Sequence, residues 1–207
     1  MELLLIRHGL PVRHASESGA DPALADDGVA QAEHLADYLS VESIDAVYAS
    51  PMRRALETAA PLARHFGLGI VVSDGLAEWD RNADEYVPIE ELRASDDPRW
   101  QAMLAGEWIS DEDPASFAVR VVDAVEAIID VHPGQVVAAV CHGGVVNAYL
   151  AHLLGRSEAG AFFAPDYTSI HRIAASRRGH RAILTLNETA HLRGTGLPVG
   201  LFERGLR

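Results

Sequence analysis

Short apolar runs alternate along the chain with amphipathic stretches. Six runs of mostly branched or small apolar residues predict buried strands; they lie at 3–6, 44–48, 70–72, 136–140, 170–174 and 182–186. The last two are joined by a polar turn at 177–180. Strands separated by helical stretches are typical of an α/β fold. We therefore expect a three-layer α/β/α sandwich whose central sheet is mostly parallel and covered by helices on both faces.

Two amphipathic helices are expected in the first third of the chain. Residues 26–39 have apolar positions at helical spacing, and Asp26 or Asp27 can serve as the N-cap. A second helix is expected to begin at Ser50, as the N-cap, with Pro51 at the first helical position.

Two further helices are expected later in the chain. Residues 117–131 have apolar residues at helical spacing. The stretch 135–154 contains no Asp, Glu or Arg, as in a membrane span, but His142 and His152 make it poorly hydrophobic for one. A buried strand, a glycine pair and a helix ending at Leu154 explain it better.

Composition limits the classes of function. The chain has 207 residues, of which 48% are hydrophobic and 23% charged, as in a globular protein with a sizeable core. A net charge of −13 argues against general binding of nucleic acids or anionic membranes. The lone Cys141 excludes an internal disulfide, and the apolar run at 3–6 is too short for a signal peptide. We therefore expect a single domain, residues 1–207, in the cytoplasm.

Most of the negative charge lies in one segment. Residues 74–113 carry 13 Asp or Glu against 3 Arg, together with four aromatic residues: Trp79, Tyr86, Trp100 and Trp108. We expect an acidic, helical excursion from the domain. It is either a solvated segment held to the body by its aromatics or a cap over a site.

Histidines follow two predicted strands, where open parallel sheets bind ligands. Arg7, His8 and Gly9 come after the first strand, and His142 follows the strand at 136–140. Arg53 and Arg54 come shortly after the strand at 44–48. Every one of the 17 basic residues is arginine, and guanidinium groups bind phosphate in a bidentate manner. Arginines, glycine turns and helix N-termini together predict a site for a phosphoryl group.

Six segments, in order, resemble motifs of the histidine phosphatase superfamily, the group related to phosphoglycerate mutase. They are Arg7-His8-Gly9, residues 21–32 (DPALADDGVAQA), 50–59 (SPMRRALETA), 76–78 (LAE), 140–144 (VCHGG) and 187–192 (NETAHL). The resemblance covers nearly the whole chain and implies a phosphoglycerate mutase-like fold.

The resemblance also implies roles for individual residues. His8 is expected to be the nucleophile that forms a phosphohistidine, and Glu78 the acid and base. Arg7, Arg54 and His142 are expected to hold the phosphoryl oxygens. A glycine and a histidine complete the set of expected phosphate-binding residues: Gly143 and His14. No metal and no cofactor are expected, because cationic side chains neutralise the transferring phosphoryl group.

Some assignments stay open at this point. Asp80, Asp84 or Glu85 can replace Glu78 if the loop is rearranged, and His14 is either a phosphate ligand or an ordinary loop residue. Arg53 is expected to be solvated. Leu10-Pro11 replaces the usual Glu-Thr or Gln-Thr after the first motif, and the usual glycines after Glu78 are missing. The specificity of known members therefore does not transfer.

The length favours a phosphatase of a small phosphorylated metabolite over the alternatives. Phosphoglycerate mutases are usually longer, and a non-catalytic phospho-ligand module has no need of all the motif residues. The resemblance makes a homodimer an expectation that composition does not test.

Overall fold

A computed structural model describes residues 1–12, 21–104, 112–156 and 162–200. Six strands form one sheet in the order β3-β2-β4-β1-β5-β6: β1 (Glu2–Arg7), β2 (Ala46–Ala49), β3 (Ile70–Val72), β4 (Val136–Cys141), β5 (Ile170–Ala175) and β6 (Arg181–Glu188). Neighbours from β3 to β1 pair in parallel, and β5 is antiparallel to both β1 and β6. The predicted α/β fold with a mostly parallel sheet is confirmed.

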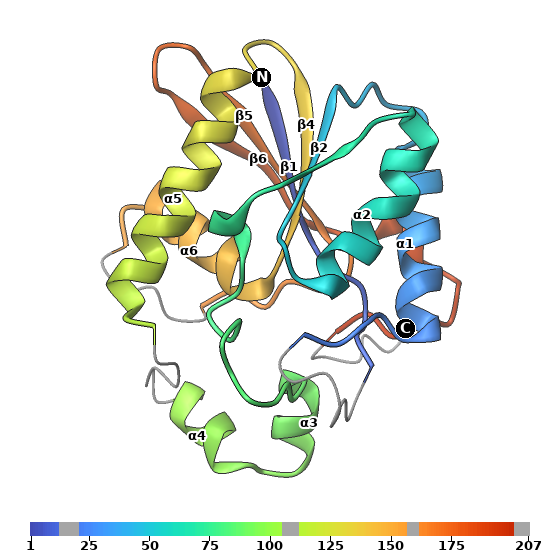
Figure 1. Cartoon of the computed structure of the whole chain (residues 1–207), viewed down its shortest axis with the longest axis vertical. Helices are drawn as coiled ribbons and strands as arrows, with labels where there is room; N and C mark the ends of the chain where they lie inside the picture. The colour runs from blue at the N-terminus through green and yellow to red at the C-terminus, as the bar shows by residue number, and fades with distance from the viewer. Residues whose placement is uncertain (13–20, 105–111, 157–161, 201–207) are drawn as a thin grey trace.

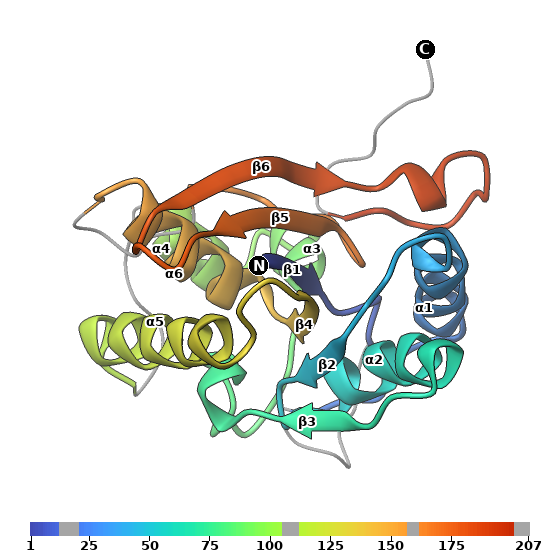
Figure 2. The ribbon, with the colours of Figure 1, turned by 90° about the horizontal axis from the view of Figure 1, so that it is seen from above.

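Helices cover both faces of this sheet. On one face lie α1 (Asp26–Leu39) and α2 (Arg53–Phe66), and on the other lie α5 (Pro114–Val131) and α6 (Gly143–Leu153) (Figure 2). None of the helices in the described ranges combines the length and the apolarity needed to cross a membrane.

The core is divided between the two faces by strand alternation. In β1, Leu3 and Leu5 pack toward α5 and α6, while Leu4 and Ile6 pack toward α1 and α2. Successive side chains of a strand point to opposite faces, so a strand between two helical layers must be apolar at every position. This is why β1 and β4 appear in the sequence as unbroken apolar runs.

The predicted bounds of α1 are confirmed, but the predicted N-caps of α1 and α2 were wrong. Helix α1 has Ala25 at its N-cap, with no capping side chain. Asp26 and Asp27 lie in the first turn instead, where the helix dipole stabilises their negative charges. Helix α2 begins at Arg53, after Ser50 and Pro51. The Ser50 amide is bound to a β4 carbonyl, and its hydroxyl is used by His142, so Ser50 does not cap the helix.

The acidic segment contains a 3-10 turn, η1 (Asp74–Leu76), and two short helices, α3 (Ile89–Ala94) and α4 (Pro98–Leu104). Its residues 105–111, with Trp108, lie outside the described ranges. In Figure 1 the N-terminus is at the top, and β1 and its parallel neighbours run downward. Helices α3 and α4 lie below them, on the side toward which the carboxyl ends of these strands point.

Candidate active site

Two histidines meet at the carboxyl ends of adjacent strands. Arg7 is in register with Cys141 across β1 and β4, so the residues that follow, His8 and His142, are neighbours. Their ring centroids lie 5.1 Å apart, and both side chains are buried. The parallel register thus builds the centre of the site from residues 134 positions apart in the sequence.

His8 is a neutral imidazole with one defined tautomer. Burial, then the positive charges of Arg54 and Arg7, hold the pKa of His8 well below its usual value. Its Nδ1 is 2.7 Å from the carbonyl oxygen of Gly9, which can only accept, so Nδ1 carries the hydrogen and donates it. The lone pair of His8 therefore lies on Nε2, the atom that can attack an electrophile.

Two arginines place positive charge beside the histidines. Arg7 donates from Nη1 to the Pro165 carbonyl at 2.7 Å, and its guanidinium lies over the Tyr167 ring at 4.2 Å. Arg54, in the first turn of α2, is fully buried. Burial lowers the pKa of both histidines most, and the charges of the two arginines lower it further.

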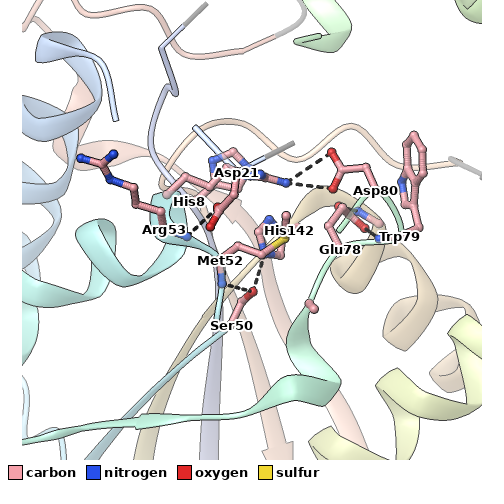
Figure 3. A network of polar contacts seen from close by, with 12 residues as sticks. His8, Asp21, Ser50, Met52, Arg53, Glu78, Trp79, Asp80 and His142 are labelled. Atoms are coloured by element: carbon pink, nitrogen blue, oxygen red, sulfur yellow. Dashed lines mark hydrogen bonds and ion pairs between the residues drawn. The ribbon is translucent and has the colours of Figure 1, made fainter. Parts of the chain in front are cut away.

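His142 precedes α6 and contacts the end of β2. Its Nε2 lies 2.7 Å from the Ser50 hydroxyl, which accepts from the Met52 amide (Figure 3). Burial, then Arg54, hold the pKa of His142 well below its usual value. Its Nδ1 is buried and has no hydrogen-bond partner among the described residues.

Glu78 is a buried carboxyl at the N-terminus of α6. Its Oε2 accepts from the Gly144 amide at 2.8 Å, and its Oε1 accepts from the Trp79 amide at 3.1 Å. Burial, then the charge of Asp80, raise the pKa of Glu78 to about 7. The carboxyl approaches α6 so closely that a Cβ at position 144 would lie 2.2 Å from Oε1, so any other residue there would displace the carboxyl.

Arg120 of α5 fixes the segment that carries Glu78. Its Nη1 donates to the carbonyls of Gly75 and Ala77, both at 3.0 Å, and its other donors bind Glu112. The loop that carries Glu78 is therefore tied to a helix of the main body immediately before that residue.

Asp80 and Tyr86 bring the acidic segment onto Arg54. Both oxygens of Asp80 accept from Arg54 Nη2, at 3.1 and 3.4 Å, and the Tyr86 ring lies 4.6 Å from the Arg54 guanidinium. Asp80 therefore pairs with the site arginine, and Glu78 occupies the position against α6.

A close packing of glycines supports the loop that carries His8. A Cβ on Gly28 would lie 2.0 Å from the Leu10 carbonyl oxygen, so α1 packs directly on this loop. Gln31, one turn later, accepts from the Leu10 amide, and Thr58 of α2 accepts from the Gly9 amide. These contacts explain why glycine and glutamine stand three residues apart in the second motif.

Comparison with known proteins assigns the family. The sequence profile of the histidine phosphatase superfamily (branch 1) matches residues 3–189. The chain belongs to this superfamily. It is 31% identical over 201 residues to phosphoserine phosphatase 1 of Hydrogenobacter thermophilus, covering 93% of this chain and 94% of that protein. It is 26% identical over 220 residues to the metal-independent phosphoserine phosphatase of Arabidopsis thaliana, and the match covers 99% of this chain and 87% of that protein.

Solved structures of other phosphatases share this fold. Phosphoserine phosphatase of Entamoeba histolytica, in complex with 3-phosphoglyceric acid, matches with a TM-score of 0.71 at 23% identity, covering 92% of this chain and 98% of that one. A mycobacterial glucosyl-3-phosphoglycerate phosphatase matches with a TM-score of 0.74 at 23% identity, covering 91% and 99%.

The structure brings most of the expected residues of a histidine phosphatase site together. They are Arg7, His8, Arg54, Glu78, His142 and Gly143, the first residue of α6. Arg53 is exposed, as predicted, and it is also paired with Glu57. His14 lies outside the described residues, so its role stays a prediction.

Sequence reasoning missed three contacts of the site. Tyr167 stacks on Arg7, Tyr86 stacks on Arg54, and the Ser50 hydroxyl binds His142. The serine stood in a recognised motif but was interpreted as a helix cap. Tyr86 is one of the aromatics expected to hold the acidic segment to the body, but no sequence signal paired it with Arg54. Tyr167 lies in a loop without a periodic pattern, and no sequence signal identified it.

Proposed function

We propose that this protein, a histidine-dependent phosphatase by family, hydrolyses the phosphomonoester of a small metabolite through a phosphohistidine at His8, without a metal. One observation carries the proposal. A neutral histidine with its lone pair on Nε2 lies beside two guanidinium groups and near a buried carboxyl whose pKa is about 7. These are the nucleophile, the anion site and the acid that phosphoryl transfer requires.

The phosphoryl group is bound by cationic and N–H donors. Arg7 and Arg54 neutralise its charge, and the amide of Gly143 contributes the N-terminus of α6. The Ser50 hydroxyl can donate to His142 Nε2, which leaves the histidine hydrogen on Nδ1. A phosphoryl oxygen would then be the acceptor for this buried donor, which otherwise has no partner in the described structure.

The reaction proceeds in two displacements. His8 Nε2 attacks phosphorus, the bond from phosphorus to the ester oxygen breaks, and Glu78 gives its proton to that oxygen. The Glu78 carboxylate then takes a proton from water, and the resulting hydroxide attacks the phosphohistidine. Inorganic phosphate leaves, and His8 and Glu78 return to their neutral forms. Each step conserves charge and protons within these groups.

The acidic segment serves as a cap in this proposal. Asp80 and Tyr86 both contact Arg54, which supports a role over the site rather than a purely solvated excursion. Residues 1–207 then form a single histidine phosphatase domain. Because relatives are named phosphoserine phosphatases, phosphoserine is the first substrate to test. A cytoplasmic location and a homodimer remain proposals, to be tested by fractionation and light scattering.

Phosphate release in the presence of a chelator tests the proposal. The panel contains phosphoserine, phosphoglycerates, sugar phosphates and an aryl phosphate, and isomerised products are measured in parallel. Wild type is compared with His8→Ala and with His180→Ala, an exposed histidine in the turn between β5 and β6. We expect chelator-resistant hydrolysis that is lost only in His8→Ala. Isomerisation without release would instead identify a mutase, and phosphate binding without turnover a non-catalytic module.

A further inference from the structure

Asp80 is the second carboxyl group of the site, and the proposed steps give it no direct contact with the substrate. It lies two residues after Glu78, and its side chain is mostly buried in an ion pair with Arg54. Figure 3 shows Glu78 and Asp80 on one side of His142 and His8 on the other. Asp80 is therefore part of the wall of the site that carries Glu78.

The position of Asp80 relates it to the leaving group, if the proposed function holds. In a phosphoryl transfer the attacking and leaving oxygens or nitrogens lie roughly in line on opposite sides of phosphorus. His8 attacks from one side, so the leaving alcohol lies toward Glu78, which protonates it. Asp80, on the same short loop, then faces the substituent of that alcohol.

A count of charges shows what a bound substrate does to Asp80. Both histidines are neutral, and Glu78 holds a proton in the form that acts as acid. The positive charges of Arg7 and Arg54 are balanced by one phosphoryl dianion. The phosphoryl group then competes with Asp80 for the positive charge of Arg54. A buried carboxylate whose partner is shared in this way needs another positive charge nearby, or it takes up a proton.

We propose that Asp80 determines specificity: it favours phosphomonoesters whose leaving alcohol carries an ammonium group and disfavours those that carry a carboxylate. An ammonium group near Asp80 restores the balance of charge at this wall, whereas a carboxylate adds a second negative charge in a poorly solvated place.

Three arginines of the described structure do not provide this compensation: Arg81, next to Asp80 in the chain, is exposed to solvent, and the other two are already paired. Arg53 is paired with Glu57, and Arg120 is paired with Glu112. The surrounding segment has 13 acidic residues against 3 arginines, so the wider field also favours a cationic substituent.

A matched series of two-carbon substrates tests the inference. Phosphoethanolamine, hydroxyethyl phosphate and phosphoglycolate have leaving groups with positive, zero and negative charge. For each, kcat/KM is measured with wild type, Asp80→Asn and Asp80→Ser. The matched control is Asp97→Asn, which removes the same charge from another Asp–Arg pair of the acidic segment. Differences in leaving-group reactivity cancel when the ratio between two substrates is compared across variants.

Wild type should prefer phosphoethanolamine, and the ratio of its kcat/KM to that of phosphoglycolate should fall at least about tenfold in both Asp80 variants, equivalent to about 1.4 kcal/mol. The control should keep the wild-type ratio. An unchanged ratio in an active Asp80 variant overturns the inference. If neither variant folds, a wild-type preference for phosphoglycolate overturns it. Absence of wild-type hydrolysis of all three substrates and of nitrophenyl phosphate overturns the proposed function as well, whereas hydrolysis without charge preference overturns the inference alone.

Discussion

Replacing Gly144 with alanine puts a methyl group where the Glu78 carboxyl lies. The new Cβ would be 2.2 Å from Glu78 Oε1 and 2.9 Å from Trp79 Cδ1. Atoms at such distances cannot remain, so the carboxyl must retreat by about 1 Å to reach a normal contact. Such a movement would lengthen or tilt the hydrogen bond from the Gly144 amide to Oε2, which is 2.8 Å long in a buried site.

The displacement should cost more activity than stability. A misplacement of about 1 Å can reduce a rate by about 10²-fold, and complete loss of a general acid costs about 10²–10⁴-fold. Overpacking costs about 1–3 kcal/mol of folding free energy, which the higher helix propensity of alanine offsets by up to about 1 kcal/mol. We therefore expect Gly144→Ala to fold, with kcat lowered about 10²-fold.

A double-mutant cycle shows whether the loss acts through Glu78. With Glu78→Ala there is no carboxyl to displace, so adding Gly144→Ala should change kcat by less than about a factor of two. Steady-state kinetics of the four proteins gives the coupling, and circular dichroism verifies that each is folded. Full activity in Gly144→Ala, or losses that multiply in the double mutant, would refute the assigned geometry.

Three further predictions follow from the same contacts. Because Glu78 must be protonated to act and its pKa is about 7, kcat/KM should fall as the pH rises through about 7; Glu78→Gln should abolish this limb of the pH profile, and a limb that persists would assign it to another group. Arg54→Lys removes bidentate binding, so inhibition by inorganic phosphate should weaken about 10–100-fold, and an unchanged inhibition constant would contradict the anion site. Gly28→Ala puts a Cβ 2.0 Å from the Leu10 carbonyl oxygen, so the free energy of unfolding measured by calorimetry should fall by about 1–3 kcal/mol. Gly69→Ala is the control, since its Cβ would have no atom within 4 Å, and it should leave the free energy of unfolding unchanged.

The central strands β1 and β4 were predictable because they are buried on both faces. β1 and β4 show no polar alternation, and the predicted and observed bounds differ by two residues at most. The start of α2 was not predictable from local signals, because the backbone and hydroxyl of Ser50 are used by β4 and His142. Helices α3 and α4, with six and seven residues, are too short for a periodic pattern to define their bounds.

The site also has a part that could be predicted from sequence and a part that could not. His8 and His142 could be brought together from sequence because both follow parallel strands, and parallel strands end at one edge of a sheet. The pairing of Asp80 with Arg54 could not be predicted in this way. It joins a loop residue to a helix residue 26 positions away, and it depends on the path of a segment without a periodic pattern. Sequence reasoning accordingly named Asp80 only as a substitute for Glu78.

Burial accounts for both halves of the proposed acid–nucleophile pair. Removing a group from water disfavours its charged form, whatever the sign of the charge. The pKa of His8 therefore falls and that of Glu78 rises. Arg54 and Arg7 add to the fall for the histidine, and Asp80 adds to the rise for the glutamate, which outweighs the opposing effects of Arg54 and of two backbone amides on Glu78. A single dry site thus holds a deprotonated nucleophile and a protonated acid at the same pH, which the two residues would not do in water. If the acidic segment is the proposed cap, opening it to solvent should reverse both shifts together, and the segment would then contribute to the chemistry even where it touches no substrate atom.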